Sequence, residues 1–75
     1  MQLNAIIEKD DSGYFAYIPE LKGCYSQGDT FEEALKNIRE AAELYLESLN
    51  EEETNSLKDK SFFIAPINVQ PLKAV

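Results

Sequence analysis

The sequence predicts an α+β domain of β-β-β-α-β order, in which an antiparallel sheet packs against one long helix. Three observations lead to this prediction. Apolar segments separated by polar turns fill the first 28 residues, and their short links favour antiparallel pairing. A long amphipathic stretch follows at 30–50, and a last apolar run stands at 62–65.

The first two strands are expected at 2–8 and 14–18. Every second residue from Leu3 to Ile7 is apolar, which is the pattern of a half-buried strand. Residues 9–13 are polar and end in a glycine, as a tight turn requires. Aromatic and β-branched residues then dominate the second segment, as β-strands favour.

A short third strand is expected at 24–27. A turn at 19–23 precedes it, opened by Pro19 and closed by Gly23. Gly28 follows the strand and separates it from the helix.

One helix is expected over 30–50. Thr30 suits the N-cap position, and Glu33 stands three residues later as in an S/T-x-x-E capping box. The three acids at 51–53 would face the negative end of the helix dipole, so the helix is expected to end near Asn50. Its apolar side chains recur at three- and four-residue steps and form one core-facing stripe: Phe31, Ala34, Leu35, Ile38, Ala41, Ala42, Tyr45, Leu46 and Leu49.

A polar linker is expected from 50 to 60, and a fourth strand at 62–65. Pro66 cannot donate to a strand ladder, so this strand is expected to lie at an edge or to end there. The remaining segment, 66–75, has two interpretations. It is either a frayed terminus, or a segment that adds to a sheet edge in its own oligomer or on a partner.

Composition excludes several classes of protein. The chain has 75 residues, no histidine and one cysteine, so His-dependent triads, His-bearing zinc sites and intrachain disulfides are excluded. No apolar run approaches the roughly 18 residues of a membrane span, and no signal peptide opens the chain. These features predict a cytoplasmic protein with no membrane partner. An acidic net charge of −7 argues against direct DNA or RNA binding.

The negative charge is concentrated in one segment. Residues 29–53 hold nine acids and two bases, while the other fifty residues are neutral overall. The outer helix face is either plainly solvated or a docking surface for a basic partner, whose approach it would accelerate. The candidate partner-binding residues on this face are Glu32, Glu40, Glu43 and Glu47.

Several apolar residues are candidates for a second kind of contact. Leu44 falls off the buried helix stripe, as either an isolated exposed leucine or an oligomer or partner contact. In the tail, Ile67, Val69 and Leu72 are candidates for the same role. A chain this short rarely has a core large enough for high stability, so a dimer or higher oligomer is expected.

The carboxylates do not indicate catalysis. Asp10 and Asp11 fall in a predicted turn, where aspartate is common for backbone reasons. A two-metal nuclease needs carboxylates that converge from strand interiors, and the strand interiors offer none. No enzymatic activity, cofactor or metal ion is therefore expected.

The segment 13–38 resembles the signature of the HicB antitoxin family. The pattern is G-Y-x-A-x-x-P-x-L-x-G-C, then x-x-x-G-D-T, then x-E-E-A-x-x-N-I. Most of its positions have a structural role in turns, caps and close packing. The matching residues are Gly13, Tyr14, Ala16, Pro19, Leu21, Gly23, Cys24, Gly28, Asp29, Thr30, Glu32, Glu33, Ala34, Asn37 and Ile38.

This resemblance implies a partial ribonuclease-H-like fold and an antitoxin that covers a small, basic, RNA-cleaving HicA-like toxin. Many relatives continue into a C-terminal DNA-binding domain, whereas this sequence is expected to consist of the HicB-like domain alone, over 1–75. The alternative is a solitary homo-oligomeric HicB-like scaffold or binding domain with no toxin partner.

Overall fold

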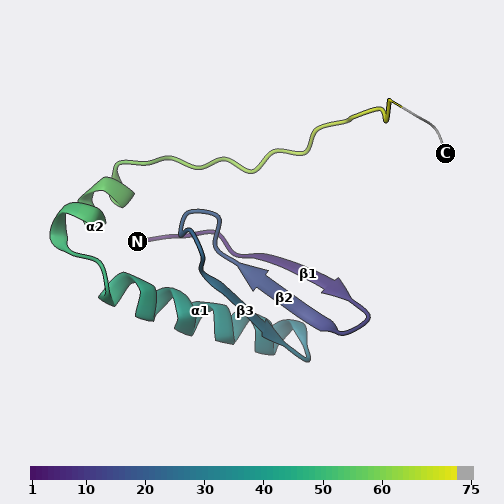
Figure 1. Cartoon of the computed structure of the whole chain (residues 1–75), viewed down its shortest axis with the longest axis horizontal. Coiled ribbons are helices and arrows are strands. Elements are labelled where there is room, and N and C mark those ends of the chain that lie inside the picture. The colour runs from purple at the N-terminus through teal and green to yellow at the C-terminus, as the bar shows by residue number, and fades with distance from the viewer. Residues whose placement is uncertain (73–75) are drawn as a thin grey trace.

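The computed structural model describes residues 1–72 and contains three strands followed by two helices (Figure 1). The strands are β1 (Ile6–Asp10), β2 (Gly13–Tyr17) and β3 (Tyr25–Gly28). The helices are α1 (Phe31–Glu47) and α2 (Glu51–Lys58). The predicted α+β class and β-β-β-α order are confirmed.

The three strands form one antiparallel sheet of order β1-β2-β3. The β1–β2 turn is closed by Asp10, whose side chain accepts hydrogen bonds from the Ser12 amide and hydroxyl, each at 2.8 Å. Gly13 follows with a φ of 136°, a conformation that favours glycine. Of the segment predicted as a turn at 9–13, only Asp11 and Ser12 form the turn, because β1 extends to Asp10 and β2 begins at Gly13.

Helix α1 packs across one face of this sheet, closest to β3 (Figure 1). Thr30 caps it, with its hydroxyl accepting the Glu33 amide proton at 3.1 Å. The buried core joins Ala34, Ile38 and Ala42 of the helix to residues of β2 and the loop after it: Ala16, Ile18, Leu21 and Cys24. The last turn ends at Glu47, with Ser48 as C-cap, so the helix ends three residues earlier than predicted.

The link between β2 and β3 is packed into the core. Leu21 and Cys24 are both buried, and the Ile18 amide donates to the Cys24 carbonyl at 3.2 Å. Outside the core, the Glu20 carboxylate holds the segment that leads into β1. It accepts hydrogen bonds from the Asn4 amide at 3.0 Å and from the Asn4 side chain at 2.7 Å.

The polar linker predicted over 50–60 is wrong, because α2 occupies most of it. Asn50 and Glu53 form a full capping box, in which the side chain of each accepts the backbone amide proton of the other. The three acids at 51–53 fall in the first turn, where the helix dipole favours negative charge. The acids that were expected to stop α1 instead begin α2, while α1 ends earlier, at Glu47.

The fourth strand predicted at 62–65 is not formed, because residues 60–71 adopt no helix or strand. Among the described residues, no backbone hydrogen bond joins 61–72 to the sheet, and a strand needs such a partner. Figure 1 shows the segment leaving α2 and extending along the side of the sheet opposite α1. Of the predicted tail, residues 73–75 lie outside the described part of the chain.

The predicted helix stripe is buried only in part. Phe31 and Leu35 are 48% and 36% exposed, although both have core-facing positions. Because α1 lies over β3 and reaches β1 only weakly, the side of the helix beneath β1 has no cover.

Candidate functional site

The acidic face of α1, defined by Glu32, Glu40, Glu43 and Glu47, is the strongest candidate surface. All four side chains are exposed. With 3.6 residues per turn they fall within an arc of about 80°. The helix turns its opposite side to the sheet, where Ala34 is fully buried. The structure thus brings the four predicted residues onto one outward surface.

The surroundings of the acidic face are also negative. Every one of the nine acids in 29–53 is exposed, and no charged side chain is buried among the described residues. Lys36 lies within the arc of the acidic face and is exposed as well. The first turn of α2 then adds three further acids beyond the end of α1. A strong negative potential over both helices follows.

Leu44 borders the acidic face. Its side chain is 67% exposed and lies about 40° around the helix from Glu40. A single exposed leucine is ordinary on a protein surface, and its position beside the acidic face is what makes it a candidate contact.

The structure does not bring the tail candidates to this surface. Ile67, Val69 and Leu72 are 78%, 76% and 104% exposed. They belong to the segment that extends on the other side of the sheet from α1, so they form a separate apolar surface (Figure 1).

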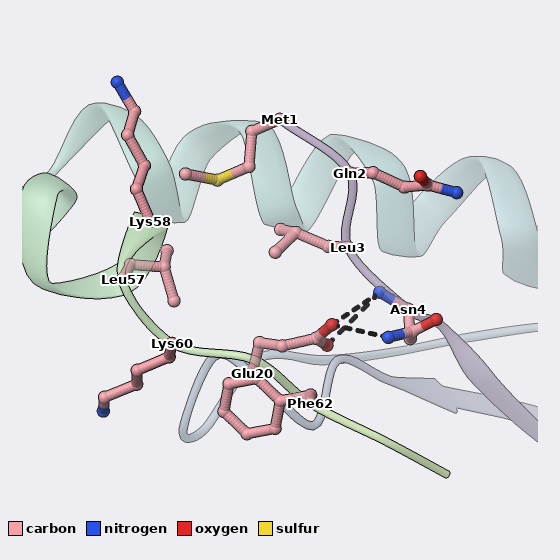
Figure 2. Close-up of a pocket in the computed structure, with 9 residues that line it drawn as sticks. All are labelled: Met1, Gln2, Leu3, Asn4, Glu20, Leu57, Lys58, Lys60 and Phe62. Atoms are coloured by element: carbon pink, nitrogen blue, oxygen red, sulfur yellow. Dashed lines mark hydrogen bonds between the residues drawn. The ribbon is translucent and has the colours of Figure 1, made fainter.

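A pocket of about 550 Å³ lies where the N-terminal segment, α2 and the start of the tail meet. Figure 2 shows the side chains of Leu3 and Leu57 pointing toward one another, and those of Lys58 and Lys60 pointing outward. Its one carboxylate, Glu20, is bound by Asn4. The sequence did not predict this pocket, because its wall includes α2, which was expected to be a linker.

The residues of the sequence signature over 13–38 have mainly structural roles. Gly13 and Gly23 have positive φ angles of 136° and 81°, and Leu21 is buried. A Cβ atom on Gly28 would lie 2.5 Å from the Ala34 amide nitrogen, so glycine allows the close approach of β3 and α1. Tyr14, Pro19 and Asp29 lie on β2 and in the links that follow β2 and β3.

The titratable groups with shifted pKa values have structural explanations. Hydrogen bonds from the Ser12 hydroxyl and amide hold the pKa of Asp10 below its ordinary value. Burial raises the pKa of the Cys24 thiol, which keeps it neutral and unreactive. Asp10 thus stabilises the β1–β2 turn, and Cys24 is part of the buried core.

The described residues contain no cluster of three acidic or cysteine side chains arranged to hold a metal ion. Within residues 1–72, neither helix has the length and apolar character needed to span a lipid bilayer.

Comparison with known proteins agrees with this structural picture. Residues 3–71 match the family described as HicB-like antitoxins of bacterial toxin–antitoxin systems. A UPF0150 protein of Helicobacter pylori is 56% identical over 69 residues, covering 92% of this chain and 96% of the relative. A UPF0150 protein of Synechocystis is 67% identical over 45 residues, covering 59% of this chain and 57% of the relative. No solved structure matches the chain significantly.

Proposed function

Because the chain belongs to the family of HicB-like antitoxins of bacterial toxin–antitoxin systems, we propose that it binds and occludes a small, basic, HicA-like toxin that cleaves RNA. The acidic face of α1 is the proposed docking surface. The encounter takes place in the cytoplasm, where such a toxin meets its RNA substrate.

The distribution of charge carries this proposal. A protein that cleaves RNA must attract phosphates, so its working surface is positive. The antitoxin presents a net charge of −7 within 29–53, with all nine acids exposed on or next to two helices. Such a surface competes with RNA for the same positive charge and increases the rate of encounter.

Leu44 supplies the apolar contact that charge alone does not. Solvent-exposed ion pairs contribute little free energy, whereas a buried apolar anchor contributes substantially to affinity. The side chain of Leu44 is 67% exposed beside Glu40, so a toxin that covers the acidic face would bury it. We assign charge to the rate of association and Leu44 to the lifetime of the complex.

The proposed role is binding, with no catalysis and no direct contact with nucleic acid. Asp10 is engaged in a turn and the Cys24 thiol is buried, so neither serves as a nucleophile or metal ligand. The acidic surface would repel the phosphates of DNA or RNA.

Calorimetric titration of the full chain with the small basic protein encoded beside it tests the proposal. We expect saturable binding, loss of RNA cleavage by the partner, and weaker binding as salt is raised. The matched pair Leu44→Asp and Leu57→Ala separates the docking surface from the pocket near the N-terminus. The first substitution should weaken binding, and the second should leave it unchanged. Absence of binding at low salt by a correctly folded chain contradicts the proposal.

A further inference from the structure

An apolar groove of about 360 Å³ lies between α1 and the segment that leads into β1. Its floor belongs to the core, because the lining residues Ile18, Ile38 and Ala42 are buried. Leu35 and Leu46 of α1 form one wall. The side chain of Leu35 remains 36% exposed, so the groove is open to water.

The N-terminal segment forms the opposite wall through Met1, Leu3 and Ala5. Two contacts hold this wall in place. Leu3 packs against the core, and the Glu20 carboxylate accepts hydrogen bonds from the Asn4 amide at 3.0 Å and from the Asn4 side chain at 2.7 Å (Figure 2). The groove is therefore formed before any partner arrives, which lowers the cost of binding.

The groove is continuous with the acidic face of α1. Glu43 belongs to both, because it lines the groove and is one of the four glutamates that define the acidic face. With 3.6 residues per turn, it lies about 80° around the helix from Leu35. Leu44 borders the acidic face on the other side, about 100° from Glu43. The acidic face thus has an apolar contact site along each of its two sides.

We propose that this groove receives an apolar side chain of the basic toxin, and that a lysine or arginine beside that side chain pairs with Glu43. The inference rests on the proposed function and adds to it the place where an apolar anchor of the toxin enters. Side chains that fill a pocket on the partner dominate the affinity of most protein interfaces, whereas exposed ion pairs contribute little. The groove would therefore determine how long the complex lasts, together with Leu44.

The charges around the groove favour this occupant. An entirely apolar ligand would cover Glu43 without pairing it, and a covered, unpaired carboxylate is costly. A base next to the apolar anchor removes that cost. Arg39 is the other charged residue that lines the groove, one turn before Glu43. Its positive charge disfavours a base at its own position and so directs the base of the partner toward Glu43.

The apolar segment 61–72 of the same chain does not fill the groove. None of its residues lines it. Figure 1 shows this segment on the side of the sheet opposite α1. Within residues 1–72, the groove is therefore free to receive a side chain from a partner.

Filling the groove tests the inference. Ala5 is exposed on the N-terminal wall, so Ala5→Trp places a large ring in the groove without altering the core. Ala65→Trp is the matched control, because Ala65 is also exposed and does not line the groove. We measure the binding kinetics of each full-length variant with the small basic protein encoded beside it. Ala5→Trp should raise the dissociation constant by at least about tenfold, mainly through faster dissociation.

The rate of association separates the groove from the acidic face. Ala5→Trp leaves all four glutamates of the acidic face in place, so its association rate should stay within about threefold of the wild type. Ala65→Trp should leave both rates within the same limit. A loss of affinity that comes only from slower association overturns the inference.

Leu35→Gln tests the opposite wall. It removes apolar surface from the groove, adds no charge and keeps a good helix former in α1. We expect the toxin to dissociate at least about fivefold faster. Phe15→Gln is the control, because Phe15 on β2 is 39% exposed and lies outside the groove. Circular dichroism verifies that each variant keeps its helices.

Tryptophan fluorescence shows whether the groove accepts an apolar side chain. The chain contains no tryptophan, so each introduced ring is the only one. Ala5→Trp should emit at shorter wavelength than Ala65→Trp, and equal emission overturns the inference. If the wild type, Ala5→Trp and Leu35→Gln bind the toxin equally well, the inference is wrong and the proposed function stands. If the wild type does not bind, both are wrong.

Discussion

The side-chain amide of Asn37 donates a hydrogen bond to the carbonyl of Gln27 at 2.8 Å, and so joins the middle of α1 to β3. One residue further along the strand, Gly28 meets the backbone of Ala34 at the closest approach of helix and sheet. These two contacts set the position of α1, and with it the direction in which the acidic face points.

Replacing Asn37 by alanine should lower the free energy of unfolding by about 1 kcal/mol, because the Gln27 carbonyl loses a hydrogen-bond partner. Urea denaturation followed by circular dichroism measures this loss. Lys36→Ala is the control, since Lys36 is exposed on the adjacent position and should change stability by no more than about 0.5 kcal/mol. Equal effects of the two substitutions would show that the Asn37 contact contributes nothing.

Gly28→Ala should destabilise the domain by about 2–3 kcal/mol, because its Cβ would lie 2.5 Å from the Ala34 amide nitrogen and force the helix away. Gly23→Ala is the matched comparison. Gly23 has a φ of 81° and open space around its Cβ position, so only backbone strain of about 1 kcal/mol is expected there. Thermal unfolding of both variants distinguishes steric clash from strain, and a larger loss for Gly23→Ala would contradict this account.

Asn50→Ala should unfold α2 and leave α1 in place. The substitution removes the side chain that accepts the Glu53 amide proton at 2.7 Å, and loss of such a cap costs about 1 kcal/mol. Hydrogen exchange should show faster exchange confined to Glu51–Lys58. Asn55→Ala lies inside the same helix, where alanine is the better helix former, and should slow that exchange or leave it unchanged.

Cys24 should react slowly with iodoacetamide in the folded state and at an ordinary rate in urea, because burial raises the pKa of its thiol. The same shift has a consequence for stability. The unfolded chain loses the thiol proton at lower pH than the folded chain, so stability is full below the ordinary thiol pKa and falls above it. Cys24→Ala should remove this part of the alkaline loss in urea titrations between about pH 7 and pH 10. Rapid alkylation of the folded protein would contradict the burial of Cys24.

Local signals predicted the second and third strands and α1 to within a few residues, because each is encoded locally, whereas the first strand covers Ile6–Asp10 and not 2–8. Thr30 and Glu33 mark the start of α1, and Gly13 marks the first turn. The acids at 51–53 were misinterpreted. Acidic side chains are unfavourable at the C-terminus of a helix and favourable at its N-terminus, so these residues are consistent either with the end of one helix or with the start of the next. Asn50 and Glu53 have the spacing of a capping box, and this pair indicates the start of a helix at 51.

The fourth strand and the exposed side of α1 depended on information that the local sequence does not contain. Phe62 to Ala65 have the composition of a strand, but a strand forms only where another edge receives it. Periodicity placed Leu35 on the core stripe, yet α1 lies over β3, and the Leu35 side of the helix remains partly exposed. The acidic face was predictable, because helical spacing alone puts Glu40 and Glu47 on one exposed surface.

The rate at which the full chain associates with its basic toxin, measured by stopped flow at low salt, tests the central claim most directly. We predict that Glu40→Lys/Glu47→Lys slows association by about tenfold or more, and that added salt removes most of the difference. The control Glu51→Lys/Glu52→Lys changes the net charge equally but lies on α2, and should slow association by no more than about threefold. Equal slowing by both pairs, or no slowing by the first, would contradict docking on the acidic face of α1.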